Sequence, residues 1–419
     1  MTLDDFDRQW TANKLLVEAC AHGSAFLVQK AIHMKACAWN NAFKEACLTG
    51  QQTMAERMIN RGADDWRGGL RCACFGGHLH LVTWIIDMGI NNLCIEYHDE
   101  LVSQGNDCIG LQEEMMKHYL NKGFESACHG GHIDIVEHMI QLGANNWNLG
   151  LDSACQSGHI DIVKRMIEMG ADSWNIGLEA ACYGGHCGLA TLMVERGATD
   201  MDRGLYGACQ GGHCKIVDDM IGRGAADWNN GLVMACLGGH RSIVNNMIDR
   251  GATDWNEGLA RACKGGHLDL VNLMIEQGAT NWNLGLHSAC YGGRRNIVER
   301  MIEMGADDWN DGLYNACFTG HLDIAMMMIG MGANNWNTSL GGACVNGHRD
   351  LVELMIEKGA NNWDLCLRYA CRAGNMPMVR TMLENGATDL NGGLRWAHGA
   401  GRRHIVKFMI KNGARHNEV

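Results

Sequence analysis

Cysteine and histidine are the residues of this 419-residue chain that are best suited to bind a metal or form cross-links. Thirteen of the 20 cysteines share one register, with a spacing of 27 residues or, once, two such periods: Cys20, Cys47, Cys74, Cys128, Cys155, Cys182, Cys209, Cys236, Cys263, Cys290, Cys317, Cys344 and Cys371. A histidine follows four residues after this cysteine in nine places: His78, His132, His159, His186, His213, His240, His267, His321 and His348. Such pairs could bind zinc on a helix, and the cysteines could form disulfides.

Both of these chemical interpretations conflict with the spacing. Equivalent residues of stacked helices lie about 8–10 Å apart, whereas a disulfide needs Cα atoms within about 7 Å. Two ligands do not close a zinc site, and glycine between them ends the helix. We therefore interpret the cysteines as small buried core residues and the histidines as donors to backbone groups at a turn. We expect no metal, no cofactor and no catalytic residue, since no phosphate-binding loop or nucleophile elbow occurs.

The 27-residue period extends over almost the whole chain and predicts a repeat array. Fifteen repeats run from residue 13 to residue 417, after an N-terminal segment of residues 1–12. Residues 13–39 and 391–417 are the expected capping repeats. Residues 94–120 form a degenerate repeat that lacks the Ala-Cys, Gly-Gly-His and Trp signatures. A metal site in this repeat, with ligands among Glu96, His98, Asp99, Glu100 and Cys108, is a weaker alternative to a decayed repeat that bends or loosens the stack.

Each repeat is predicted to contain two short helices. Residues 148–174 illustrate the two apolar stripes: Leu151, Ala154 and Cys155 in the first helix, and Ile162, Val163, Met166 and Ile167 in the second. Asn148 is expected to cap the first helix, and Gly170 fits the left-handed position after the second. The single proline, Pro377, falls in the first turn of a second helix, where proline is tolerated. Short helices of this kind are stable only when stacked, so we expect an all-α solenoid.

The repeated motif Leu-x-x-Ala-Cys-x-Gly-Gly-His-x-Asp-Ile-Val-x-x-Met-Ile-x-x-Gly-Ala resembles the core of the ankyrin repeat. The resemblance implies an ankyrin-like helix-turn-helix fold and a role in binding proteins. Ankyrin repeats usually have 33 residues, and the six that are missing here are those of the β-hairpin finger. Binding through fingers is therefore not expected, which leaves the face of the first helices. The short repeats ending in Gly-Ala-x-Asp-Trp-Asn resemble arrays of large DNA viruses of protists, which would imply a viral protein.

Composition narrows the classes of partner. The net charge is −12, from 35 basic and 47 acidic residues, and this argues against nucleic acid and anionic membranes. No apolar stretch is long enough to span a membrane, and the start MTLDDFDRQW is not a secretory signal. Many unpaired cysteines indicate a reducing compartment. We expect a cytoplasmic protein, in the host cytoplasm if viral, with the nucleus as the alternative, and a monomer is favoured over an oligomer.

A binding surface is expected where the repeats differ from one another. Repeat positions 2, 5, 6 and 9 vary and lie on the side of the first helix opposite the Leu-Ala-Cys face, which lines the concave groove of an ankyrin-like stack. Aromatic and cationic residues gather there, as is typical of binding surfaces. The predicted partner-binding residues are Phe75, Tyr183, Tyr206, Leu237, Lys264, Tyr291, Tyr314, Phe318, Tyr369, Arg372 and Trp396. Rings that only cover one another between repeats are the alternative.

Two further features, the basic last repeats and the tryptophans at the repeat ends, could serve either in binding a partner or in stabilising the fold. The last repeats are basic, with Arg368, Arg372, Arg395, Arg402, Arg403, Lys407 and Lys411, and could dock an acidic partner or serve as a polar cap. Ten repeats end in tryptophan, which we interpret as packing in the shortened loop rather than as a binding stripe. The sequence thus predicts a non-enzymatic protein-interaction scaffold that binds host proteins. The alternative is a structural component that assembles with itself or other viral proteins.

Overall fold

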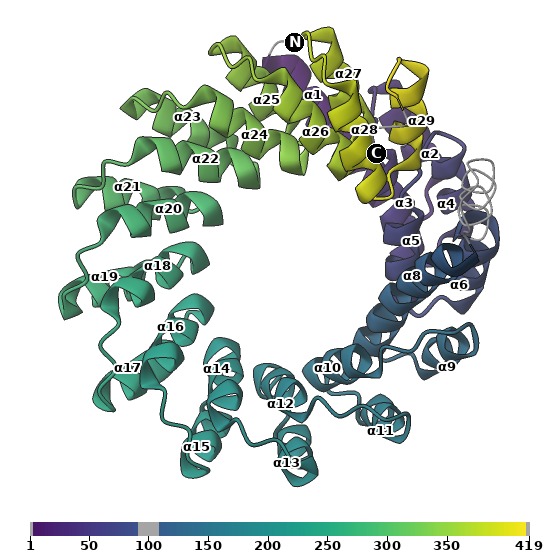
Figure 1. Ribbon diagram of the computed structural model, residues 1–419. Helices are drawn as coiled ribbons and strands as arrows, with labels where there is room; N and C mark the ends of the chain where they lie inside the picture. The colour runs from purple at the N-terminus through teal and green to yellow at the C-terminus, as the bar shows by residue number, and fades with distance from the viewer. Residues whose placement is uncertain (1–2, 91–108, 416–419) are drawn as a thin grey trace. The chain divides into compact units, whose positions relative to one another are not determined.

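The structure is a computed structural model that describes residues 3–90 and 109–415. Every regular element among these residues is a helix, as predicted. The chain forms two compact units, an N-terminal unit of Met1–Ala225 and a C-terminal unit of Ala226–Val419. Within each unit, the first helices of the repeats lie side by side in one row and the second helices lie in another (Figure 1). In the described part of the chain, no helix combines the length and apolarity needed to cross a membrane.

The N-terminal unit begins with a helix that continues from the predicted N-terminal segment into the first repeat. Its row of first helices consists of α1 (Leu3–Ala21), α3 (Trp39–Leu48), α5 (Trp66–Gly76), α8 (Ile109–Gly130), α10 (Trp147–Ser157), α12 (Trp174–Tyr183) and α14 (Met201–Gly211). The second helices are α2 (Ala25–His33), α4 (Gln52–Ile59), α6 (Leu79–Ile85) with the π-helical turn η1 (Ile86–Ile90), α9 (Ile133–Gln141), α11 (Ile160–Glu168), α13 (Cys187–Arg196) and α15 (Cys214–Gly222).

The C-terminal unit continues the same alternation. Its first helices are α16 (Trp228–Gly238), α18 (Trp255–Gly265), α20 (Trp282–Gly292), α22 (Trp309–Thr319), α24 (Trp336–Asn346), α26 (Trp363–Ala373) and α28 (Leu390–Gly399). The second helices are α17 (Arg241–Asp249), α19 (Leu268–Gln277), α21 (Arg295–Glu303), α23 (Leu322–Met331), α25 (Arg349–Glu357), α27 (Met376–Glu384) and α29 (Arg403–Lys411).

The start of the first helix differs from the sequence prediction. Asn148 does not cap α10, because the cap is Asn146, whose side chain accepts a hydrogen bond from Leu149 N. The tryptophan assigned to the end of the preceding repeat is the first residue of this helix. Asn148 instead joins the helix to the loop after its repeat, and its Oδ1 accepts from the backbone N–H groups of Asp172 and Ser173 at 2.8 and 3.1 Å. Both residues thus satisfy backbone donors that would otherwise lack partners.

The helix ends follow the predicted glycine pattern. Gly158 ends α10 at φ 85°, and Gly170 follows α11 at φ 99°, both in the left-handed region that glycine adopts without strain. Asp161 lies in the first turn of α11, where a negative charge suits the helix dipole. Pro377 lies in the first turn of α27, as expected. The residues at these helix starts and ends therefore determine where the chain turns between the two helices of a repeat.

Within each unit, the core is a ladder built from the apolar stripes of both helices of each repeat. In one repeat of the C-terminal unit the fully buried residues are Leu286, Ala289 and Cys290 of α20 and Ile297, Val298 and Met301 of α21. The equivalent residues of the neighbouring repeats are buried in the same way. Burying one such leucine side chain contributes roughly 1.5–3 kcal/mol, so most of the stability comes from stacking rather than from single helices.

The degenerate repeat changes the order of the stack. Helix α8 runs without a break from the end of this repeat into the first helix of the next one, and it packs directly on α5. His132 Nε2 lies 3.0 Å from the carbonyl oxygen of Phe75, a partner that is 57 residues away. The fifth repeat therefore stacks on the third. The residues weighed above as metal ligands, 96–108, lie outside the described residues.

Candidate functional site

The backbone of the predicted binding surface is held by the histidine ladder. His213 Nε2 lies 3.0 Å from the carbonyl oxygen of Tyr183, and His267 Nε2 lies 3.2 Å from that of Leu237. His78 and His159 make the same contact in two other repeats of the N-terminal unit, with the carbonyl oxygens of Leu48 and His129. The predicted bond to backbone is confirmed for these histidines. It joins successive repeats, because the acceptor of each of these four histidines is 30 residues earlier.

Other side chains donate to the carbonyl oxygen at position 9 in some repeats. Arginine does so where it replaces the histidine, and in one repeat an asparagine does so as well. Arg294 Nε donates to the carbonyl oxygen of Lys264 at 3.4 Å, and Arg402 Nε donates to that of Arg372 at 3.1 Å. Asn346 Nδ2 donates to the carbonyl oxygen of Phe318 at 2.6 Å. A donor at this place fixes the backbone of position 9, which carries the exposed side chains of the surface.

We expect His267→Ala to lower the free energy of unfolding by about 1–2 kcal/mol, because the carbonyl of Leu237 loses its donor. His267→Arg should retain most of that stability, since Arg294 and Arg402 already serve this role in the chain. Urea unfolding followed by circular dichroism measures both changes. Equal losses in the two variants would contradict a hydrogen-bonding role for the side chain.

Four of the predicted residues form one contact cluster on α18, α20 and α22 of the C-terminal unit. Lys264 Nζ lies 4.6 Å from the centroid of the Tyr291 ring. The Tyr291 and Phe318 rings are stacked with centroids 6.3 Å apart, and Phe318 lies 6.1 Å from Tyr314. We call Lys264, Tyr291, Tyr314 and Phe318 the aromatic cluster. The rings partly cover one another, yet Tyr291 remains 38% exposed.

Two glycines of α24 leave room for rings on either side. A Cβ atom at Gly342 would lie 3.2 Å from the Tyr314 ring, and one at Gly341 would lie 3.5 Å from the Tyr369 ring. The ring of Tyr314 therefore lies over the backbone of the next first helix. The missing side chains let the aromatic surface continue towards α26.

A second group of predicted residues lies on α26 and α28. Tyr369 and Trp396 are in edge-to-face contact with centroids 5.4 Å apart, and the Arg372 guanidinium lies 5.7 Å from the Trp396 centroid. Arg372 and Arg395 are exposed, whereas Arg368 forms an ion pair with Asp389. This end of the surface combines positive charge with aromatic rings.

The predicted residues of the N-terminal unit are less closely joined. Phe75 is 44% exposed and stacks on His129 with centroids 5.5 Å apart. Tyr183 on α12 is 37% exposed, and Tyr206 on α14 is half-buried. Leu237, on α16 of the C-terminal unit, is also half-buried. The structure thus brings some of the predicted partner-binding residues together through ring contacts. The others lie on the first helices of their own repeats.

The first helices of the N-terminal unit also carry acidic residues that were not singled out from the sequence. Burial, together with the nearby carboxylates of Glu179 and Glu125, raises the pKa of Asp152 above its ordinary value. Arg203 acts against this shift and forms an ion pair with Glu179 at 2.8 Å. Asp152, Glu179 and Arg203 therefore form a charged group on α10, α12 and α14 that was not singled out from the sequence.

Comparison with known proteins agrees with this repeat architecture. The family model described as ankyrin repeats (3 copies) matches residues 286–365. Among solved structures, the chain is similar to the crystal structure of the human ASB11 ankyrin repeat domain, with 23% identity, coverage of 44% of this chain and 98% of that chain, and a TM-score of 0.32. The curated proteins gave no match.

The cysteine ladder of the repeats is structural. All ladder cysteines are free and buried, as predicted. Burial raises the pKa of Cys236, Cys263 and Cys290 to about 12, so these groups are thiols at neutral pH. A buried protonated thiol is a poor nucleophile and a poor metal ligand.

The tryptophans make packing contacts where each ankyrin-like repeat joins the next. Trp66 lies between Phe43 and Trp84, with centroids 5.7 and 5.8 Å away. The Arg250 guanidinium lies 5.3 Å from the Trp228 centroid. These contacts support the predicted role in packing at the shortened loop.

Proposed function

We propose that the chain is a non-enzymatic scaffold that binds a protein partner through the face of its first helices. Ankyrin repeats bind proteins, and such repeats occupy residues 286–365. The observation that carries the proposal is the aromatic cluster on α18, α20 and α22, where Tyr291 stays exposed beside a lysine. Aromatic residues with a neighbouring cation are enriched in the energetic centres of protein interfaces.

The physical mechanism follows from how this surface is held. The side chains of Lys264 and Phe318, both at position 9, project from a backbone whose carbonyl accepts a hydrogen bond from the next repeat. A partner that docks on such a surface does not have to order it, so little conformational entropy is lost on binding. We propose that the first helices of the C-terminal unit line a concave groove, with the aromatic cluster as its anchor and the polar first-helix residues of this unit as its rim.

The nature of the partner is proposed from the sequence pattern. The 27-residue repeats without finger hairpins resemble arrays of large DNA viruses of protists, so we propose a viral protein that binds a host protein in the host cytoplasm, with the nucleus as the alternative compartment. The competing proposal is an assembly component that binds itself or other viral proteins. It draws on exposed apolar residues of a second helix, such as Met326 at 57% exposure on α23.

A pull-down from cell lysate, followed by mass spectrometry, tests the proposal. The variant Tyr291→Ala/Phe318→Ala should capture the partner at least ten-fold less well than wild type, because both rings are removed from the surface. Met326→Ala/Met331→Ala on α23 is the matched control, since it removes exposed apolar side chains from the second-helix row. Capture lost only in the control variant, or recovery of the chain itself alone, would favour the assembly role.

A further inference from the structure

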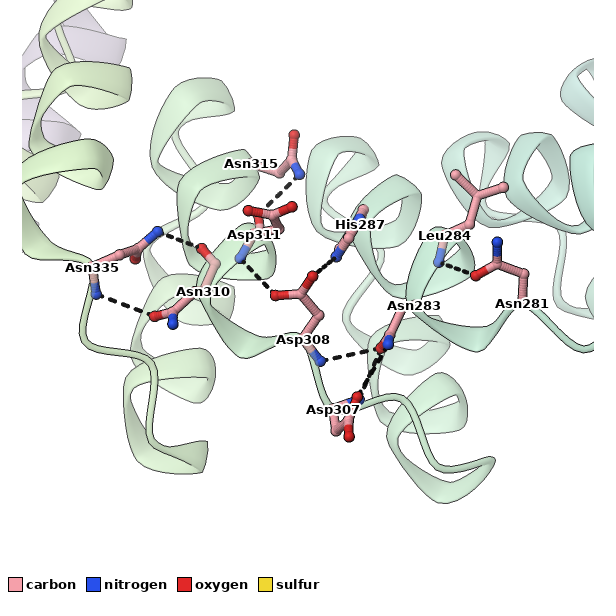
Figure 2. A network of polar contacts seen from close by, with 10 residues as sticks. All are labelled: Asn281, Asn283, Leu284, His287, Asp307, Asp308, Asn310, Asp311, Asn315 and Asn335. Atoms are coloured by element: carbon pink, nitrogen blue, oxygen red, sulfur yellow. Dashed lines mark hydrogen bonds and ion pairs between the residues drawn. The ribbon is translucent and has the colours of Figure 1, made fainter.

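A polar cluster with the composition of a metal site lies between α20 and α22. His287 of α20 faces Asp308 and Asp311 at the start of α22 (Figure 2). One ligand atom from each residue lies within 4.8 Å of the others. Ligands of one octahedral ion, at about 2.1 Å from it, are about 3–4 Å apart, so small side-chain rotations would bring these three atoms onto a common cation.

The imidazole is shielded and lacks a proper hydrogen bond. The His287 side chain is 24% exposed, but Nε2 itself is shielded from solvent. Its distance to Asp308 Oδ2 is 3.2 Å, yet the alignment does not meet hydrogen-bond geometry, and Nε2 has no other partner among the described residues. An imidazole nitrogen in this position can offer its lone pair to a cation.

At this junction a histidine takes the place of the lysine or arginine that pairs with the aspartate in other repeats. Lys44 pairs with Asp65 at 3.5 Å, and Arg368 pairs with Asp389 at 2.6 Å, in each case between repeat positions 5 and 26. At the junction of α20 and α22, position 5 is His287, and in the described part of the chain neither Asp308 nor Asp311 pairs with a lysine or arginine. Two carboxylates with no lysine or arginine partner among the described residues concentrate negative charge that a divalent cation would offset.

Backbone contacts hold the acidic side of the cluster in place. Asp308 is the N-cap of α22, and its Oδ1 accepts from Asp311 N at 3.3 Å. Asn283 Oδ1 accepts from the backbone N–H groups of Asp307 and Asp308 at 2.8 and 3.1 Å, which ties this loop to α20 (Figure 2). The ligands thus come from two helices that a side chain already links.

We propose that His287, Asp308 and Asp311 bind a divalent first-row metal cation, with water filling the remaining positions. One imidazole and two carboxylates are ligands that suit Mn²⁺ and related ions. Ions that prefer thiolate ligands would be less informative probes, because they could also bind to cysteines elsewhere in the chain. The cation would bridge α20 and α22, the helices that carry Tyr291 and Tyr314 of the aromatic cluster. This proposal is independent of the proposed function.

Electron paramagnetic resonance of Mn²⁺ added to the full chain tests the site, since the signal of free Mn²⁺ falls as the ion binds. Wild type should bind one more equivalent of Mn²⁺ per chain than either His287→Ala or Asp311→Asn, or should bind that equivalent at least ten-fold more tightly. Asp308 is left unchanged because it caps α22. The matched control is Glu257→Gln at the junction of α16 and α18, where Asp254 and Glu257 occupy the same two positions but Val233 replaces the histidine.

The proposal requires the control to bind like wild type. No bound Mn²⁺ in wild type, or equal binding in wild type and both cluster variants, would overturn it. An equal loss in Glu257→Gln would also overturn it, because general surface acidity would then account for the binding.

Discussion

The C-terminal unit should unfold cooperatively between about pH 9 and pH 11, because its buried thiols cannot ionise in place. Each of five ladder cysteines has a pKa raised by burial from 9.0 to about 12: Cys236, Cys263, Cys290, Cys317 and Cys371. A group whose pKa is raised by folding stabilises the fold fully below its unfolded pKa, and this contribution is lost as the pH rises towards the folded value. The loss therefore begins near pH 9.

The size of this effect is large for the whole unit. At pH 10 each such thiol lowers the free energy of unfolding by about 1–2 kcal/mol relative to neutral pH, so the five together lower it by roughly 5–10 kcal/mol. Native domains are stable by about 5–15 kcal/mol, so the fold should be lost near this pH. Far-UV circular dichroism of the reduced protein against pH measures the midpoint.

Replacing these five cysteines by alanine gives the matched control for alkaline unfolding. Alanine occupies this slot in the ankyrin core that the repeats resemble, so the variant should fold, although each small cavity costs some stability. Lysines and tyrosines titrate equally in both proteins, so the difference isolates the thiols. A midpoint at the same pH in the alanine variant would show that the thiols do not control alkaline stability.

Leu286→Ala should lower the free energy of unfolding by about 3 kcal/mol. Leu286 is fully buried between helices of neighbouring repeats, and its removal leaves a cavity that the stack cannot close. In a repeat array each repeat contacts only its neighbours, so the loss weakens the stack on both sides of α20. Urea unfolding followed by circular dichroism gives the change.

Leu284 provides a control on the same helix. It is half-exposed and two residues from Leu286, so Leu284→Ala should cost less than about 1 kcal/mol. Similar losses in both variants would mean that the predicted apolar stripe does not form the core.

The regular parts of the fold were predictable because they repeat. Residues such as Leu286 and Cys290 recur every 27 positions, and recurrence marks core positions directly. His78, His159, His213 and His267 were assigned correctly to backbone hydrogen bonds, although their acceptors lie in the preceding repeat. The cap was misplaced from Asn146 to Asn148, because asparagines two residues apart both precede an apolar stripe and only geometry distinguishes their partners.

The features that could not be predicted depend on contacts between residues that do not repeat. Stacking of Tyr291 on Phe318 joins variable positions of two helices. The direct packing of α8 on α5 reflects one repeat that lost its signatures but kept its length. The acidic ligands of the proposed metal site, Asp308 and Asp311, lie 21 and 24 residues after His287, and no spacing rule connects them.

The central claim is that a protein partner docks on the first-helix face, and photo-cross-linking in cells tests it most directly. A benzophenone amino acid would replace Tyr291 on α20 in one protein and Met326 on α23 in another, since both side chains are exposed. The account predicts one distinct protein cross-linked from position 291 and not from position 326. Cross-linking of a partner from position 326 alone would contradict it and place the binding surface on the second helices.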